Sequence, residues 1–447
     1  MNLRMRLFLL AAALSRGLSL HAGEAKFPVP APDTERLQWW RDARFGLFIH
    51  WGPVSLKGTE IGWSRGGERR GYNSRGTQIP VEVYDNLYRQ FNPTRFNADE
   101  WVSIAKAAGM KYLVFTSRHH DGFSMFDTQA DDYKITSPNN PFRRDVVREL
   151  ANACHRAGLR FGLYYSQPNW HHPDAFTDRH TNYLAFLKTQ VRELLTNYGP
   201  LDIFWFDGLG KTAKDYDAEA MNRMIRELQP RILINNRNGR LAEDFDTPEQ
   251  VIGKFQYNRP WESCITICNQ WAWKPDDKMK SLKDCLETLI RCAGGDGNLL
   301  FNVGPMPDGR IESRQVKRLE EMGAWLKKYG ETIYGTRGGP WKPAKSFAST
   351  RKGNTVFGHL LSYSGKTVTL PNIPRKIVAS SLLTGGTAQV NQSDRHISIR
   401  VAAPPAHPPA NGAELLLPPG PSRSTPPQID SILKLELDSS AMDLEPL

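Results

Sequence analysis

Asp207 is the first candidate for a catalytic residue in this sequence. It ends the apolar stretch LDIFWFDG, residues 201–208. Side chains alternate along a strand, so Trp205 and Asp207 share one face, and Phe204 and Phe206 share the other. Two apolar faces are typical of a parallel strand covered on both sides. An acid at the carboxyl end of such a strand lies where barrels build active sites, although it can also only cap a helix or start a turn.

Polar and aromatic side chains end other apolar stretches in the same way. They are His50, Trp51, His119, His120, Tyr164 and Arg237. The Gly- and Arg-rich segment 57–80 contains Trp63 and is predicted to form a long loop, and loops of that length inside a compact domain are usually functional. Glu262 follows Trp261 in a later segment that we interpret as a loop. Taken singly, each of these residues is more often structural.

Metal and serine chemistry are the weaker interpretations of this set. A metal site would use His50, His119 and His120 with Asp207. Adjacent histidines on a strand point to opposite faces, which disfavours binding of both to one ion. The sequence contains no GxSxG motif, so an activated serine of the α/β-hydrolase kind is not predicted. We expect no metal and no other cofactor.

Glycoside hydrolysis needs two carboxyl groups and aromatic walls. Asp207 and Glu262 supply the pair, with Asp207 as the rigidly held, ionised group and Glu262 as the proton donor and acceptor. Sugars expose C–H faces that stack on indole rings, and several tryptophans are available: Trp205, Trp261, Trp271 and Trp273. Hydroxyl groups could be bound by a polar set: His50, His119, His120, Tyr164 and Arg237.

The elements that must position these side chains alternate between helix and buried strand. Helices are predicted over residues 98–109, 144–158, 177–198, 217–228, 278–293 and 312–329. Two of them stop at Gly109 and Gly158, and each glycine precedes a buried strand. An open doubly wound sheet and a (β/α)8-like barrel both fit this alternation. The barrel is favoured because polar or aromatic residues end every strand.

The predicted organisation has four parts. A signal peptide covers residues 1–22, the (β/α)8-like barrel residues 23–337, and a small all-β sandwich domain residues 338–418. Residues 419–447 are a Pro- and Ser-rich tail, partly disordered, whose last segment either adds one strand or stays outside the fold. The signal peptide predicts a secreted or periplasmic protein.

Composition excludes several other classes of protein. The 447-residue chain has a net charge of +11, but its basic residues are scattered and no nucleic-acid motif is present. Beyond the leader no apolar run is long enough to span a membrane. The odd cysteine count, 5, leaves at least one free thiol; buried thiols are expected, and one or two disulfides remain possible.

Seven motifs in order resemble glycoside hydrolase family 29, the α-L-fucosidases. They are FGLFIHWGP, HHDGF, GLYYS, WFDG, the NxR of residues 235–237, PWESCITI and GNLLFNVGPMPDG. The resemblance covers roughly residues 35–335. It implies a (β/α)8-like barrel with a β-sandwich, and retaining hydrolysis of terminal α-L-fucosides without a metal.

The resemblance also implies roles for individual residues. Asp207 in WFDG matches the family's nucleophile, which forms a covalent fucosyl-enzyme. The residues matched to the sugar pocket are His50, Trp63, His119, His120, Tyr164, Trp205 and Arg237. Tyr164 is chosen over Tyr165, and Trp63 lies in a loop that departs from the commoner family pattern. Glu262 is the expected acid/base, with Glu60 and Glu68 as rivals.

The expected substrate is a fucosylated oligosaccharide or glycoconjugate. Two alternatives stay open. One is a retaining glycosidase for a related sugar such as an α-L-galactoside, which differs only by a hydroxyl on C6. The other is a catalytically silent fucose-binding protein, against which the presence of Asp207 argues.

Overall fold

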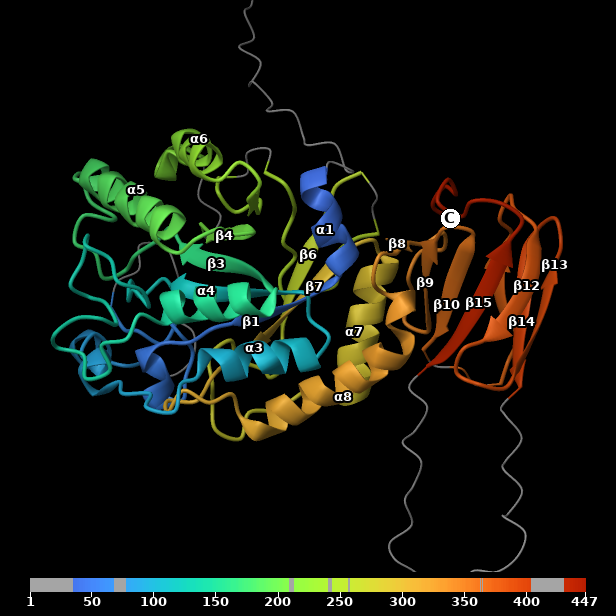
Figure 1. The fold of residues 1–447 in the computed structure, drawn as a ribbon, viewed down its shortest axis with the longest axis horizontal. Coiled ribbons are helices and arrows are strands. Elements are labelled where there is room, and N and C mark those ends of the chain that lie inside the picture. Colours follow the sequence, from blue (N-terminus) through green and yellow to red (C-terminus); the bar gives the residue numbers. More distant parts are fainter. Residues whose placement is uncertain are drawn as a thin grey trace, which may run out of the picture.

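The computed structural model describes residues 35–67, 78–208, 213–239, 243–255, 258–361, 363, 365–402 and 430–447. These residues form a TIM-like domain with an all-β domain at its side (Figure 1). The predicted signal peptide, residues 1–22, and the rival acid Glu68 lie outside the described residues.

A curled parallel sheet is the centre of the larger domain. Its strands are β1 (Phe45–Ile49), β2 (Tyr112–Arg118), β3 (Arg160–Ser166), β4 (Ile203–Asp207), β5 (Leu233–Ile234), β6 (Glu262–Thr266) and β7 (Asn298–Val303). Their order is β5-β4-β3-β2-β1-β7-β6, and every neighbouring pair is parallel. Parallel pairing brings the carboxyl ends of all seven strands to one rim of the sheet.

The two edge strands of this sheet meet through one extended segment, residues 244–250. Isolated parallel bridges join its Phe245 to Asn235, directly after β5, and its Glu249 to Cys264 in β6. Backbone hydrogen bonds continue along both sides, since Asp244 N donates to Ile234 O and Gln250 N donates to Cys264 O. The segment therefore occupies the gap between β5 and β6.

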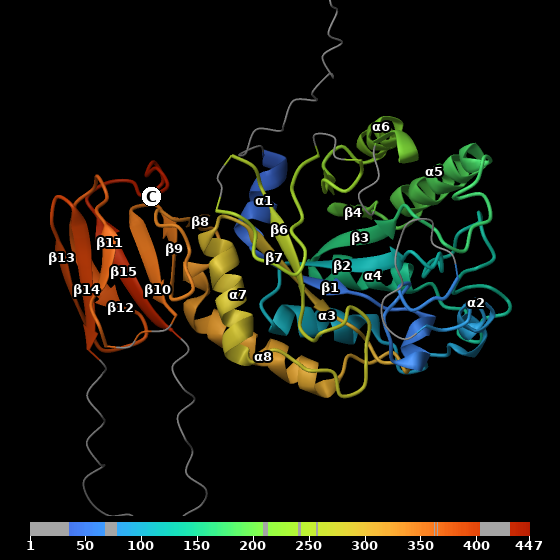
Figure 2. The same cartoon turned by 180° about the vertical axis from the view of Figure 1, so that it is seen from behind.

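Helices cover the outer face of the sheet and one helix closes its amino end (Figure 2). The longer ones are α1 (Glu35–Ala43), α3 (Ala98–Ala107), α4 (Val146–Ala157), α5 (His180–Asn197), α6 (Ala218–Leu228), α7 (Leu282–Gly294) and α8 (Ser313–Tyr329). The alternation along β4 is as predicted: Phe204 and Phe206 pack outward against helices, and Trp205 belongs to the inner cluster. Trp40 of α1 lies in that inner cluster against Phe245.

Local sequence explains where these helices begin and end. Asn97, Asp145 and Ser281 cap α3, α4 and α7, each accepting a hydrogen bond from a backbone N–H in the first turn. Gly158 ends α4 with φ 65°, a left-handed conformation that glycine adopts at little cost. The repeated joint of helix, glycine and buried strand predicted from the sequence is thus present.

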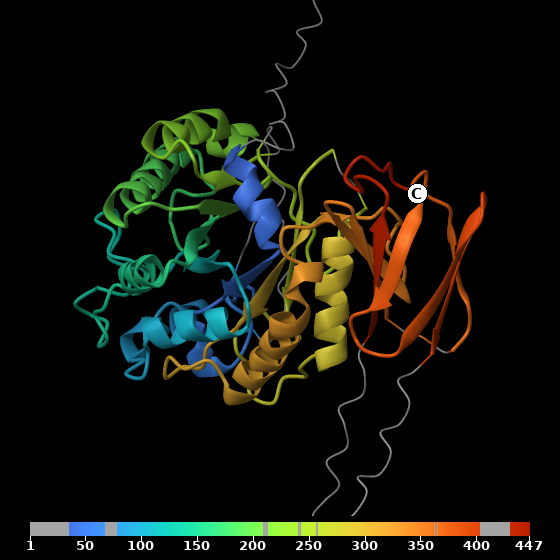
Figure 3. The ribbon, with the colours of Figure 1, turned by 45° about the vertical axis from the view of Figure 1, so that its right-hand side comes forward.

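The all-β domain consists of two antiparallel sheets around a shared apolar core. The five-stranded sheet has the order β12-β15-β10-β9-β8, and the three-stranded sheet β11-β14-β13. Their strands are β8 (Arg337–Gly338), β9 (Phe347–Lys352), β10 (Thr355–Leu360), β11 (Val368–Pro371), β12 (Ile377–Leu382), β13 (Thr387–Gln392), β14 (His396–Ala402) and β15 (Ser431–Leu437). Helix α7 stands between this domain and the parallel sheet (Figure 3).

The last strand matches one of the two options that the sequence left open for the predicted tail. Residues 419–447 were expected to follow the β domain, with one further strand as an option. Ser431–Leu437 forms this further strand, β15, which pairs with β10 on one side and β12 on the other. Leu433 and Leu435 of this strand are fully buried in the domain's core. The strand β15 is therefore an internal part of the β domain, which extends beyond residue 418, the end of the sandwich domain expected from the sequence.

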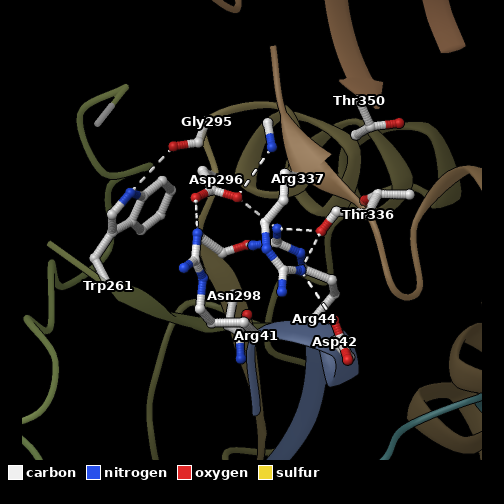
Figure 4. Close-up of polar contacts among 12 residues, drawn as sticks. Arg41, Asp42, Arg44, Trp261, Gly295, Asp296, Asn298, Thr336, Arg337 and Thr350 are labelled. Atoms are coloured by element: carbon white, nitrogen blue, oxygen red, sulfur yellow. Dashed lines mark hydrogen bonds and ion pairs between the residues drawn. The ribbon is translucent and has the colours of Figure 1, made fainter. Parts of the chain in front are cut away.

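A buried ionic cluster joins the two domains at the amino end of the sheet (Figure 4). Asp296, in the loop between α7 and β7, accepts from Arg44 Nη2 at 2.5 Å and from Arg41 Nη2 at 2.7 Å. The same carboxylate accepts the backbone N–H of Gly338 in β8 at 2.9 Å, and Arg44 also donates to Thr336 O. One aspartate thus holds together α1, the sheet and the first strand of the β domain.

The described residues contain no disulfide, no membrane-spanning helix and no cluster of metal ligands. All five cysteines are free and buried. None of the helices in the described ranges is long and apolar enough to cross a membrane. Within those same ranges, no three His, Cys, Asp or Glu side chains are grouped so that they could hold a metal ion.

Candidate active site

A pocket of about 290 Å³ opens at the carboxyl ends of the parallel strands. Its lining combines acidic, basic, amide and aromatic side chains: Phe48, His50, Glu60, Trp63, His119, His120, Tyr164, Trp205, Asp207, Arg237, Glu249, Gln250, Cys264, Asn269, Gln270 and Trp271. Eight of the nine predicted site residues lie in this lining, and Glu262 is the exception.

Asp207 lies at the bottom of the pocket as the last residue of β4. Tyr164 donates its hydroxyl to Oδ2 at 3.0 Å, and Arg237 Nη1 donates to Oδ1 at 3.2 Å. Burial alone would raise the pKa of Asp207, but the Arg237 charge and these hydrogen bonds outweigh it and hold the pKa below its usual value. The carboxylate is therefore ionised at neutral pH and fixed in orientation, as a nucleophile must be.

Two histidines beside Asp207 are neutral hydrogen-bonding groups. Burial lowers the pKa of His50 to about 3 and that of His120 to about 4. His50 Nδ1 lies 2.7 Å from Oδ1 of Asn302, whose amide nitrogen donates to Trp271 O. Because Oδ1 can only accept, His50 carries its proton on Nδ1 and turns an unprotonated Nε2 away from Asn302.

His119 and Tyr164 form a further wall of the pocket. The two rings are stacked, with centroids 5.5 Å apart. Burial lowers the pKa of His119 well below its ordinary value, and its Nδ1 has no hydrogen-bond partner among the described residues. Of the two neighbouring tyrosines, Tyr164 lines the pocket, whereas Tyr165 points outward and donates to Gln190 at 2.9 Å.

Trp205 and Arg237 form a cation–π pair beside Asp207. The Arg237 guanidinium carbon lies 4.7 Å from the centroid of the Trp205 ring, and Trp205 stacks on Tyr164 at 5.6 Å. A cation above an indole face is attracted by the ring's quadrupole, which holds the guanidinium beside the carboxylate.

Glu60 and Trp63 enter the pocket from the loop after β1. Glu60 accepts three backbone N–H groups, those of Ile61, Trp271 and Ala272. Burial raises its pKa to about 7 in spite of these hydrogen bonds. Trp63 meets His120 edge to face at 5.6 Å. Glu60 therefore ties two pocket loops together, and both of its oxygens are already engaged.

Glu262 does not lie in the pocket, which corrects the sequence prediction. It is the first residue of β6, at the opposite end of the sheet from Asp207, and is 0% exposed. Tyr112 donates to it at 2.5 Å and Trp205 Nε1 at 3.2 Å. Tyr112 reaches it by crossing Gly46, where a Cβ would fall 2.2 Å from the ring. A leaving group in the pocket has no path to this carboxyl.

Glu249 is the acidic residue that sequence reasoning missed. It lies near the end of the extended segment 244–250 that bridges β5 and β6, at the open side of the pocket, with its side chain 42% exposed. Arg237 Nη1 donates to Glu249 Oε2 at 2.9 Å, and the same nitrogen donates to Asp207 Oδ1 at 3.2 Å. The nearest oxygens of the two carboxylates are therefore at most about 6 Å apart, a limit within which the 5–5.5 Å separation of retaining glycosidases falls.

The predicted tryptophan walls divide between the pocket and the core. Trp205 and Trp271 line the pocket, and Trp271 lies 4.7 Å from the His50 ring. Trp261 is buried at the amino end of the sheet, where its indole donates to Gly295 O (Figure 4). Trp273 is not part of the lining and packs near Gly58.

Comparison with known proteins decides the family. The α-L-fucosidase family model matches residues 25–331, more than half of the chain. The chain belongs to the α-L-fucosidase family. It is a glycoside hydrolase of family 29, as the ordered motifs predicted.

Individual relatives support the same assignment. The chain is 31% identical to the human plasma α-L-fucosidase over 337 residues, which is 67% of this chain and 69% of the relative. It is 30% identical to the rat tissue α-L-fucosidase over 362 residues, 75% of this chain and 77% of the relative.

Solved structures agree with this α-L-fucosidase fold. Isoenzyme 1 of the α-L-fucosidase from Paenibacillus thiaminolyticus is 33% identical, with a TM-score of 0.75 over 91% of this chain and 99% of that one. The α-L-fucosidase AlfC, in a complex with 4-nitrophenyl-α-L-fucopyranoside, is 30% identical, with a TM-score of 0.58 over 66% of this chain and all of that one.

Proposed function

We propose that this family 29 enzyme is a retaining exo-α-L-fucosidase that removes terminal α-L-fucosyl residues from oligosaccharides or glycoconjugates. Asp207 is the nucleophile and Glu249 is the acid/base. The observation that carries the proposal is the single Arg237 nitrogen that joins both carboxylates across the pocket. A pocket of about 290 Å³ closed at one end suits one terminal sugar.

In the first step Asp207 attacks the anomeric carbon of the bound sugar. The bond from that carbon to the aglycone oxygen breaks, and Glu249 transfers a proton to the departing oxygen. Tyr164 and Arg237 hold the attacking carboxylate ionised and oriented until the new bond forms. The product of this step is a covalent glycosyl-enzyme and a free aglycone.

In the second step a water molecule enters from the open side. Glu249 takes its proton, the water oxygen attacks the anomeric carbon, and the bond to Asp207 breaks. Glu249 suits this role because its exposed side chain meets both the departing aglycone and the incoming water. Glu60 suits it less well, because backbone N–H groups already occupy both of its oxygens.

The proposal includes the finer architecture of the sheet. Residues 244–250 act as the missing strand of a (β/α)8-like barrel between β5 and β6, with no helix of their own. Asp207, Arg237 and Glu249 then lie at or just beyond the carboxyl ends of three consecutive strands around the rim, which accounts for their convergence. Export by the predicted signal peptide completes the proposal and would give the enzyme access to extracellular glycans.

Release of 4-nitrophenol from 4-nitrophenyl α-L-fucoside tests the proposed function. Wild type should turn over and release L-fucose first as the α anomer, which proton NMR can follow. Asp207→Gly should be inactive, and azide should restore aryl release with inverted β-L-fucosyl azide as the product. First release of the β anomer would contradict a retaining mechanism.

The same assay separates the two alternatives. Faster turnover of the 4-nitrophenyl α-L-galactoside than of the fucoside would favour an enzyme for the related sugar. Binding of L-fucose without any turnover would favour a silent fucose-binding protein. The wild-type α-L-fucosidase is expected to prefer the fucoside and to bind it more tightly than the galactoside.

A further inference from the structure

Ser166 is a buried residue behind the pocket, outside its lining and beside the catalytic machinery. It is the last residue of β3 and lies in register with Asp207 of β4. Its hydroxyl contacts His120 Nδ1 at 2.6 Å. We propose that Ser166 is a positioning residue that holds His120 as the Nδ1-protonated tautomer, so that Nε2 accepts a hydrogen bond from a sugar hydroxyl beside Asp207.

Hydrogen-bond accounting at Ser166 carries the argument. The hydroxyl has one proton, and it lies 2.6 Å from the carbonyl oxygen of Pro168 as well as 2.6 Å from His120 Nδ1. A carbonyl oxygen can only accept, so the serine proton belongs to Pro168. The contact with His120 is then a hydrogen bond only if the ring supplies the proton from Nδ1.

The backbone that carries Ser166 is also held in place. Arg118 donates from Nη2 to the carbonyl oxygen of Ser166 at 2.6 Å. Arg118 is fully buried and also donates to Gln190 and Tyr183. The backbone of Ser166 is thus anchored by a side chain that has its own fixed partners.

The consequence appears on the other side of the His120 ring. In the Nδ1-protonated tautomer, Nε2 presents a lone pair, and it lies 3.6 Å from Asp207 Oδ2. Two acceptors at that distance do not bond to each other, so the side-chain donors to Asp207 among the described residues are Tyr164 and Arg237. The opposite tautomer would donate a proton toward the carboxylate and compete with its attack.

A sugar hydroxyl is the donor that fits between these groups. The inference rests on the proposed function, in which the anomeric carbon approaches Asp207 to about 3–3.5 Å. A hydroxyl on the neighbouring carbon then lies within reach of His120 Nε2. The ring packs against Trp63 in a T-shaped contact and against Trp170 in a tilted one, with centroid distances of 5.6 and 5.1 Å.

The tautomer can be read directly from the unliganded wild-type enzyme. Long-range proton–nitrogen NMR on protein labelled with ¹⁵N-histidine distinguishes protonated from unprotonated ring nitrogens, and His120→Gln identifies the signals by their loss. The expected result is a protonated Nδ1 and an unprotonated Nε2. A protonated Nε2 would overturn the proposal. This reading does not depend on turnover, so it stands even if the proposed function fails.

A variant tests the effect on catalysis. Ser166→Ala should lower kcat/KM for 4-nitrophenyl α-L-fucoside about 10- to 100-fold and reduce the preference over the 2-deoxy fucoside about tenfold or more. Ser117→Ala is the matched control, because Ser117 is equally buried and donates to a carbonyl oxygen without touching a histidine. If Ser166→Ala kept the wild-type preference for the fucoside over the 2-deoxy fucoside, the positioning role of Ser166 would be contradicted. If this variant does not fold, the NMR measurement on the wild-type enzyme tests the proposal by itself.

Discussion

Three glutamates within the described residues compete for one role in this enzyme, and their surroundings separate them. Glu249 is exposed at the pocket mouth and bound to Arg237. Glu60 lies in the lining but is held by backbone N–H groups. Glu262 is sealed in the interior under Trp205. Only the first can meet both a leaving group and water without a change in structure.

Glu262 should matter for stability and much less for turnover. Burial raises its pKa from 4.5 to about 7, so between these values the folded protein holds one proton more than the unfolded chain. The free energy of unfolding contributed by this group is therefore largest below pH 4.5 and is lost as pH rises toward 7. Relative to Glu262→Gln, wild type should lose about 2–3 kcal/mol between pH 5 and pH 8.

Denaturant unfolding at several pH values measures this difference. The control is Glu436→Gln, because the Glu436 side chain is half exposed. That variant should keep a constant difference from wild type. Glu262→Gln should also keep its kcat/KM within about tenfold of wild type, since the carboxyl contacts the pocket only through Trp205. A pH-independent difference for Glu262→Gln would contradict the assignment.

At the scale of elements, the end of the strand on which a carboxylate stands decides its role. Asp207 follows the apolar residues of β4, and Glu262 precedes those of β6. In parallel strands these positions lie at opposite ends of the sheet. The order of residues in PWESCITI already contained this signal, but interpreting the motif as a loop hid it.

Glu249 could not be found in the same way. Residues 244–250 have no strongly apolar pattern that would predict a strand. Single bridges and backbone hydrogen bonds to two strands that are distant in sequence hold the segment in place. The helices and strands with clear periodicity were predictable from local sequence, as β4 and α4 demonstrate. A segment whose conformation depends on its neighbours was not.

The ionic cluster around Asp296 should be a major support for the joint between the domains. Its two arginine partners hold the pKa of Asp296 below its usual value although burial alone would raise it. Asp296 has a φ of 66°, a left-handed conformation that asparagine also tolerates. Asp296→Asn should therefore remove the negative charge without straining the backbone. We expect a loss of about 3–5 kcal/mol in the free energy of unfolding, because Arg44 remains buried without its carboxylate.

The matched comparison is Asp99→Asn. Asp99 pairs with Arg156 at a similar distance, 2.7 Å, but both side chains are more than half exposed. Its loss should cost no more than about 1 kcal/mol. If the two substitutions lowered the free energy of unfolding equally, the prediction that the buried ion pairs stabilise the protein more than an exposed pair would be wrong.

At the scale of the whole molecule, the chain returns to complete its β domain. The strand β15 lies between β10 and β12 although more than sixty residues separate it from β10. The terminal Leu447 N–H donates to Pro340 O, beside the first strand of the domain. Local sequence offered this strand only as one of two options, because its partners β10 and β12 lie far from it along the chain.

Leu435 tests the structural role of the last strand. It is fully buried between the paired residues Val356 and Ser380. Leu435→Ala should destabilise the protein by about 2–5 kcal/mol through lost burial and a residual cavity. Glu436→Ala on the same strand, where the side chain is half exposed, should have little effect. Similar melting temperatures for both variants would argue against a central β15.

The pairing of Asp207 with Glu249 is most directly tested by azide rescue of Glu249→Ala. With 4-nitrophenyl α-L-fucoside the covalent intermediate should still form, because nitrophenolate leaves without a proton, and it should then react slowly with water. Azide needs no general base, so it should accelerate turnover and yield α-L-fucosyl azide with retained configuration. Glu262→Gln, treated identically, should hydrolyse the substrate without azide. Rescue of a Glu262 variant, or no rescue and no loss of activity in Glu249→Ala, would contradict the account.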